Sequence, residues 1–147
     1  GEHFANGLVA TKKPKLMVAN NVLAHVPDIH DFIEGFSQLI AEDGMITLEF
    51  PHLVSLIKNN QFDTIYHEHM SYHTAISMEK FCKDFGFKLE EVIAFGDQMN
   101  DISMISIVGF GVAMGNARDE VKEIADYVTL SNDKNGVAYA IRTQILK

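Results

Sequence analysis

The chain has 147 residues, a length typical of one domain. Hydrophobic residues make up 47% of it and charged residues 22%, which excludes a disordered or fibrous chain and allows a packed core. With 20 Asp and Glu against 12 Lys and Arg, the formal net charge is -8. Phosphate backbones and anionic lipids repel such a surface, so we expect neither a nucleic-acid nor a membrane partner. No signal peptide or membrane-length apolar run is evident, and we expect a cytoplasmic protein.

Short apolar runs alternate with helical spacing in the first half of the chain. The helix there begins at Pro27-Asp28, where Asp is a favourable N-cap. In chain order the first half predicts a strand over 15–19, a helix from Pro27-Asp28 to Asp43-Gly44, a strand over 45–50, a short helix over 51–60 and an irregular, His-rich segment over 61–76.

The second half continues the same alternation. The single cysteine, Cys82, lies in a helical pattern with Phe81 and Phe85, so we interpret it as a small buried apolar residue rather than a nucleophile. The predicted elements are a helix from Ser77 that stops at Gly86 as its C′ residue, a strand over 91–95, a helix over 101–108, a strand over 111–114, a helix capped by Asn116 and ending near Ala125, a strand over 127–130 and a helix over 136–146.

Apolar strands that alternate with helices favour a parallel sheet covered by helices on both faces. We therefore predict a single α/β domain over residues 1–147, with three layers and a five-stranded parallel sheet in the flavodoxin- or Rossmann-like order 2-1-3-4-5. A ligand crevice in such a sheet lies at the carboxyl ends of strands 1 and 3. The residues expected there are Asn20, Asn21, His25, Gly96, Asp97 and Asp101.

Two segments of the first half carry a first candidate site, VANNVLAHVPDIHDF (residues 18–32) and FDTIYHEHMSY (residues 62–72). With them, residues from about 3 to 88 resemble the second half of the Rossmann-like domain of S-adenosylmethionine-dependent sugar C-methyltransferases. The resemblance implies that His69 is a general base that removes a proton next to a keto group. It implies that Tyr66, Glu68 and His25 position the sugar or polarise its oxygens.

The residue types suit that chemistry, because a carbon acid needs a base with a pKa near neutrality and a partner for the enolate. Two alternatives stay open: a polar loop that simply carries two histidines, and a zinc site at His67 and His69. No glycine-rich cofactor loop precedes Asn20, so we assign no cofactor-binding residue and expect the methyltransferase-like residues to be inactive remnants.

The run VIAFGDQMNDISMISIVGFGVAMGNARDEVKEIADYVTLSNDKNGVAYAI (residues 92–141) carries a second candidate site. With it, residues from about 76 to 147 resemble the C-terminal part of Cof-type phosphatases of the haloacid-dehalogenase superfamily. The resemblance implies that Asp97 and Asp101 hold Mg2+, with Asn100 and Asn132 near the phosphate or the metal. Mg2+ prefers a few carboxylates together with water and substrate oxygens. The alternative is a tight turn in which Asp101 is a helix N-cap.

The chain lacks other parts of a phosphatase site. It contains no Asp-x-Asp segment for a nucleophile, and Met78 stands where the resemblance implies a phosphate-binding lysine, with Lys80 off register. We therefore interpret the chain as a chimera of segments 1–88 and 77–147, either engineered or a natural gene fusion, with no complete active site, no native catalytic function, no required cofactor and at most weak Mg2+ binding. The alternatives are a residual Mg2+-dependent phosphatase or phosphate binder, and a remnant methyltransferase. A homodimer that covers an exposed sheet edge is a further option.

Overall fold

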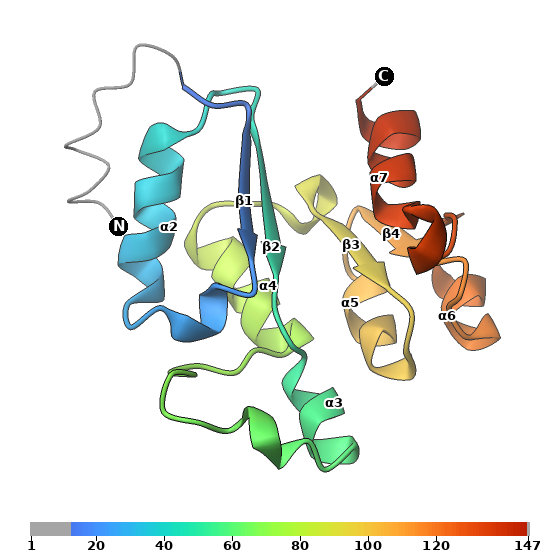
Figure 1. Cartoon of the computed structure of the whole chain (residues 1–147). Helices are drawn as coiled ribbons and strands as arrows, with labels where there is room; N and C mark the ends of the chain where they lie inside the picture. The colour runs from blue at the N-terminus through green and yellow to red at the C-terminus, as the bar shows by residue number, and fades with distance from the viewer. Residues whose placement is uncertain (1–12, 147) are drawn as a thin grey trace. The chain divides into compact units, whose positions relative to one another are not determined.

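The computed structural model describes residues 13–146, and it divides the chain into two compact units, Gly1–Thr74 and Ala75–Lys147 (Figure 1). Each unit combines helices with a sheet in which every strand pairing is parallel, which confirms the predicted α/β class. The boundary falls two residues before Ser77, where the sequence predicts the start of the helix common to both resemblances. That the two units form one domain stays a prediction.

The first unit is built around two strands, β1 (Leu16–Asn20) and β2 (Met45–Glu49), which pair in parallel from Leu16 opposite Met45 to Asn20 opposite Glu49. The helix between them, α2 (Ile29–Leu39), begins as predicted, because the Asp28 side chain accepts a hydrogen bond from the Asp31 amide. Within residues 13–74, the remaining elements are the 3-10 turns η1 (Leu23–His25) and η2 (Phe62–Thr64) and the helix α3 (Leu53–Lys58).

The second unit contains a three-stranded sheet in the order β3-β4-β5, formed by β3 (Ile93–Gly96), β4 (Phe110–Ala113) and the two-residue β5 (Tyr127–Val128). Its helical elements are α4 (Ala75–Asp84), η3 (Leu89–Glu91), η4 (Met99–Asp101), α5 (Ile102–Ile105), α6 (Asp119–Ile124), η5 (Asn132–Lys134), α7 (Gly136–Ala140) and the π-helical turn η6 (Ile141–Ile145).

The predicted single sheet is not observed, because the strands form two separate sheets, one in each unit. The neighbours 2-1 and 3-4-5 of the predicted order are present, whereas no pairing between β1 and β3 occurs among the described residues, so the full order 2-1-3-4-5 is not confirmed. Among the described residues, one face of β1 is largely exposed. Its Leu16 and Val18 side chains are 57% and 56% exposed, because a two-stranded sheet leaves much of one face open.

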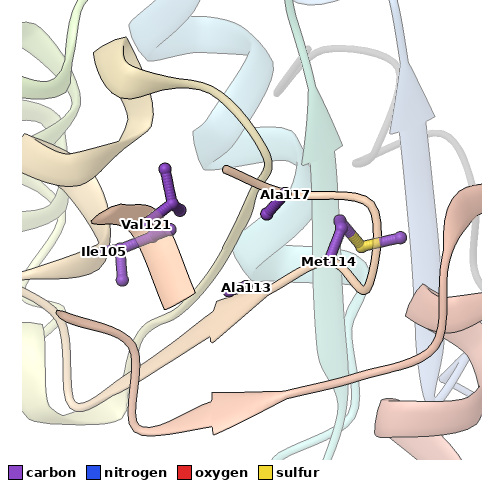
Figure 2. Packing of buried hydrophobic residues seen from close by; sticks show 5 residues of the cluster. All are labelled: Ile105, Ala113, Met114, Ala117 and Val121. Atoms are coloured by element: carbon purple, nitrogen blue, oxygen red, sulfur yellow. The ribbon is translucent and has the colours of Figure 1, made fainter. Parts of the chain in front are cut away.

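A cluster of buried apolar side chains forms the core of the second unit (Figure 2). Val112 and Ala113 on β4 are fully buried, as is Val121 on α6. Figure 2 shows the cluster residues gathered beside β4, where α5 and α6 contribute to the same packed region. The cluster consists of Ile105, Ala113, Met114, Ala117 and Val121. This packing fixes the backbone just before and after the polar loops at the carboxyl ends of the strands.

Two helix boundaries show where local sequence decides the structure and where it does not. Gly86 has φ of 77° after α4, as its predicted C′ role requires, and the Phe87 amide donates to the Cys82 carbonyl. The predicted cap at Asn116 is wrong, because α6 begins three residues later and Arg118 is its N-cap residue. Among the helices of the described chain, none has the length and apolar character needed to cross a membrane.

Candidate functional site

The polar turn after β3 is organised by one carboxylate. Asp101 Oδ2 accepts hydrogen bonds from the backbone amides of Asp97 and Gln98, both at 2.9 Å, and Asp101 Oδ1 accepts one from Asn100 Nδ2 at 2.7 Å. The carboxylate thus folds back over the end of β3. A Cβ atom at Gly96 would lie 2.4 Å from Asp101 Cβ, so only glycine allows this close approach.

Asp101 occupies the N-cap position of α5, as the alternative interpretation predicted, but it does not cap the helix with its side chain. Its side chain makes no cap hydrogen bond to α5, and it closes the preceding turn instead. This occurs because the 3-10 turn η4 ends at Asp101 and brings its carboxylate back toward the amides of the strand end. The alternative of a tight strand-to-helix turn is observed, with Asp101 as its organising group.

The loops after β3, β4 and β5 are joined by a chain of hydrogen bonds. Asn116 Nδ2 donates to Asp97 Oδ2 at 3.0 Å, and Asn116 Oδ1 accepts from the backbone amide of Asn132 at 2.9 Å. In addition, the Arg118 amide donates to the Asp97 carbonyl at 3.2 Å. Because parallel strands all end at the same sheet edge, these loops bring Asp97, Asn116 and Asn132 together. We call these three residues the strand-end network.

The strand-end network has the chemical character of a Mg2+ and phosphate site. Mg2+ is held in proteins by one or two carboxylates, with water and substrate phosphate oxygens as further ligands. Asp97 is half-buried, and its Oδ1 makes no hydrogen bond within the described part of the chain, so this oxygen is open to a cation. Asp101 lies four residues away with both oxygens already accepting hydrogen bonds. The Asp97 carboxylate is therefore the group in this network whose chemistry fits a magnesium ion.

Sequence reasoning missed the bridging role of Asn116. It placed Asp97, Asn100 and Asn132 near a phosphate or a metal, and assigned Asn116 to a helix cap. The structure brings Asp97 and Asn132 together through Asn116, whereas the Asn100 side chain donates to the Asp101 carboxylate. An available signal was position: Asn116 follows a buried strand by three residues, where a polar side chain reaches the neighbouring loop.

The first unit brings some of its predicted site residues together. The Tyr66 hydroxyl lies 2.9 Å from His69 Nε2, and His69 Nδ1 lies 2.7 Å from the Thr64 carbonyl. Since a carbonyl only accepts, Nδ1 carries the hydrogen and donates. In the neutral ring Nε2 is then the basic nitrogen and accepts from Tyr66. The His25 ring packs edge-on against His69 with centroids 4.7 Å apart.

Glu68 does not contribute its carboxylate to that cluster. Its carbonyl contacts His25 Nδ1 at 3.0 Å, whereas its side chain is 63% exposed and lies 3.9 Å from the 91% exposed His67. The zinc alternative at His67 and His69 is equally unsupported, because His69 is turned toward Tyr66 and Thr64. Across residues 13–146, no group of three or more His, Cys, Asp or Glu side chains is arranged to hold a metal ion.

Within the described chain, the other residues named from the sequence make local contacts that do not join either candidate site. Asn20 ends β1, and Asn21 has φ of 52° with its amide donating to the Glu49 carbonyl. Lys80 on α4 forms an ion pair with Asp84 at 2.6 Å. Partial burial raises the pKa of the Cys82 thiol, which keeps it protonated at neutral pH and argues against a nucleophile. The predicted crevice between strands 1 and 3 stays a prediction.

The chain is similar in sequence to a hydrolase family, to phosphatases and to a C-methyltransferase. Residues 12–141 match the haloacid dehalogenase-like hydrolase family. The chain is 53% identical over 72 residues to 5-amino-6-(5-phospho-D-ribitylamino)uracil phosphatase YcsE of Bacillus subtilis, covering 49% of this chain and 29% of that protein. It is 36% identical over 124 residues to C-methyltransferase NovU of Streptomyces niveus, covering 84% of this chain and 28% of that protein.

A solved structure of a haloacid dehalogenase-like hydrolase from Bacteroides thetaiotaomicron is 30% identical, with a TM-score of 0.47, and the match covers 90% of this chain and 59% of that one. The chain spans less than a third of the length of either curated relative.

The family match corrects one expectation from the sequence. We expected a chimera with no complete active site and no native catalytic function. The expectation of a non-functional chimera is wrong: the haloacid dehalogenase-like hydrolase family matches residues 12–141, a range that includes the segment where the two resemblances overlap, and phosphatases are among the relatives. In the second unit, the Asn116 side chain connects Asp97 to the Asn132 backbone amide.

Proposed function

The chain belongs to the haloacid dehalogenase-like hydrolases, and from this premise we propose that it is a Mg2+-dependent phosphatase whose second unit binds the metal and the phosphate. The observation that carries the proposal is the hydrogen bond from Asn116 Nδ2 to Asp97 Oδ2 at 3.0 Å, which holds one carboxylate oxygen and leaves the other open. The phosphatase relatives support the proposed reaction class.

Each residue of the site has a distinct proposed role. Asp97 Oδ1 is the protein ligand of Mg2+, and Asp101 positions Asp97 by closing the turn around the Asp97 amide. Asn116 orients the Asp97 carboxylate, and Asn132 connects this arrangement to the loop after β5. Bound Mg2+ supplies charge neutralisation for the phosphate oxygens.

The proposal separates binding from hydrolysis. The 147 residues contain no Asp-x-Asp segment, so this chain offers no aspartate nucleophile of the kind that the resemblance implies. We therefore expect Mg2+-dependent phosphate binding as the stronger signal and slow hydrolysis of phosphate esters as the weaker one.

The test is a calorimetric titration of the full chain with Mg2+ and with inorganic phosphate, next to an assay for phosphate release from a phosphate ester. Asp97→Asn keeps the hydrogen-bonding shape and removes the charge, and it is expected to weaken Mg2+ binding by about tenfold or more. The matched control is Asp119→Asn, because the Asp119 side chain is 94% exposed on α6. Wild-type protein that binds no Mg2+, or equal binding by Asp97→Asn, would overturn the proposal.

A second candidate function rests on the Tyr66–His69 pair. His69 Nε2 is the basic nitrogen of a ring that the Thr64 carbonyl orients, and it accepts a hydrogen bond from the Tyr66 hydroxyl. We propose that this pair removes a proton next to a sugar keto group, as the match to C-methyltransferase NovU supports. The test is solvent deuterium exchange at that carbon of a nucleotide-linked keto sugar, followed by NMR. His69→Gln should abolish the exchange, and exchange at the uncatalysed rate in wild-type protein would contradict the candidate.

A further inference from the structure

A mostly apolar pocket of about 380 Å³ opens in the second unit beside the strand-end network. Its wall contains the aliphatic side chains of Met114, Val137, Ala138 and Ile141, while the polar side chains come from asparagines. The full lining is Met114, Asn132, Asn135, Gly136, Val137, Ala138 and Ile141. The volume lies within the range of about 300–1,000 Å³ that is typical of small-molecule sites.

The pocket and the strand-end network share Asn132. This residue lines the pocket, and its amide donates to Asn116 Oδ1, while Asn116 Nδ2 donates to Asp97. Met114 makes a second connection, because it lines the pocket and its amide donates to the carbonyl of Gly96, the residue before Asp97. The pocket therefore lies next to the strand-end network, whose other end is Asp97.

Hydrogen bonds fix one wall of the pocket. Thr129 is buried, and its hydroxyl donates to the Gly136 carbonyl at 2.7 Å, while the Gly136 amide donates to the Ser131 carbonyl at 3.0 Å. Gly136 itself cannot be replaced, because a Cβ atom there would lie 1.9 Å from the Leu130 carbonyl oxygen and 2.9 Å from Met114 Cε. Figure 2 shows the Met114 side chain pointing away from Ile105 and Val121.

We propose that this pocket binds the alcohol part of the phosphate ester, and that the preferred esters carry an apolar ring or alkyl group there. The inference rests on the proposed function, since it places the ester phosphate at Asp97. The pocket favours such a group because the complex is stabilised in proportion to the apolar surface that binding removes from water. A polyhydroxylated alcohol would lose hydrogen bonds to water against the aliphatic wall, because two asparagines cannot satisfy all of its hydroxyls.

The test compares the binding of 1-naphthyl phosphate and glycerol 3-phosphate to the full chain in Mg2+. Both probes carry the same phosphate group, so their ratio of dissociation constants reports on the alcohol part. We expect 1-naphthyl phosphate to bind about tenfold more tightly. The NMR signal of the Met114 methyl group should shift with 1-naphthyl phosphate and stay in place with glycerol 3-phosphate.

Two variants and one matched control locate the effect. Val137→Asp places a charge on the pocket wall and is expected to remove most of the preference. Ile124→Asp is its control, because the two side chains are similarly exposed, 41% and 45%, and Ile124 is outside the pocket lining. Ala138→Leu fills the pocket and should weaken 1-naphthyl phosphate while leaving glycerol 3-phosphate unchanged.

The outcomes separate this inference from the proposed function. Equal affinities for the two esters with an unmoved Met114 signal would overturn the inference and leave the Mg2+ site standing. If neither ester binds, the proposed function fails. A titration with 1-naphthol alone then decides on the pocket: a shift of the Met114 methyl signal supports an apolar site, and no shift overturns it.

Discussion

Asn116 Nδ2 donates a hydrogen bond to Asp97 Oδ2 at 3.0 Å, across 19 residues of sequence. This contact joins the loop after β4 to the loop after β3, and the Asn132 amide extends it to the loop after β5. A carboxylate held in this way has one oxygen fixed and one available. The predictions below follow from the way the network holds Asp97.

Removing the Asn116 side chain should weaken Mg2+ binding without unfolding the second unit. Asn116→Ala deletes both hydrogen bonds, and a net hydrogen bond to a charged group contributes about 1.5–3 kcal/mol, less where water competes. Because Asn116 is exposed, we expect a loss of about 1 kcal/mol, roughly a fivefold weaker Mg2+ affinity by calorimetry. Asn59→Ala in the first unit is the control, and an unchanged affinity in Asn116→Ala would contradict the role of the network.

The approach of Asp101 to Gly96 should make glycine essential at that position. Gly96→Ala places a methyl group 2.4 Å from Asp101 Cβ and is expected to destabilise the second unit by about 1–3 kcal/mol. Gly86→Ala is the comparison, because Gly86 has open space around it and only its φ of 77° opposes alanine, at a cost of about 1 kcal/mol. Thermal unfolding measures both, and a smaller effect at Gly96 than at Gly86 would refute the crowding argument.

Two substitutions at Asp101 distinguish a turn-closing role from a metal-binding role. Asp101→Asn keeps an oxygen for the Asp97 and Gln98 amides, so it should retain most of the stability, whereas Asp101→Ala leaves both amides without that acceptor. We expect the free energy of unfolding of the alanine variant to be about 1–3 kcal/mol lower than that of the wild type. Equal stability of the two variants, with Mg2+ binding lost in both, would assign Asp101 to the metal alone.

The first unit should lose stability as the pH falls below neutrality. Burial lowers the pKa of His73, whose ring lies 3.0 Å from Ser71 Oγ and packs against Phe50. The unfolded chain then binds the proton more readily than the folded chain, so stability falls as the pH drops through the ordinary histidine pKa of about 6.5. Denaturant unfolding between neutral and mildly acidic pH should show this slope.

His73→Gln should reduce that slope, because the side chain no longer titrates. His67→Gln is the control, since His67 is 91% exposed and should leave the slope unchanged. A wild-type protein whose first unit gains stability on acidification would show that another group dominates the titration.

Local rules predicted the parts of the fold that depend on neighbouring residues. The Asp28 side chain caps α2 through a hydrogen bond to an amide three residues later. Gly86 ends α4 because glycine adopts a positive φ without strain. Both effects act within one helical turn. The positions of β1 to β4 followed from apolar runs. The full five-strand order is not confirmed, because strand pairing between distant segments leaves no mark in a local pattern.

The candidate site shows the same division. The spacing of Asp97 and Asp101 was visible in the sequence, but the contact from Asn116 depends on the parallel pairing of β3 and β4, which aligns their carboxyl ends. The sequence indicated a tight turn at Asp101. It did not indicate that the Asp101 carboxylate turns back toward the end of β3, since the steric requirement at Gly96 appears only in three dimensions.

The most direct test of the central claim is an NMR titration of the full chain with Mg2+, observed at the Asn116 side-chain amide. Our account predicts that this signal shifts with Mg2+, because its hydrogen-bond acceptor is the carboxylate that binds the metal. The shift should be absent in Asp97→Asn and present in Asp119→Asn. An Asn116 signal that stays in place while Mg2+ binds elsewhere, or a chain that binds no Mg2+, would contradict the account.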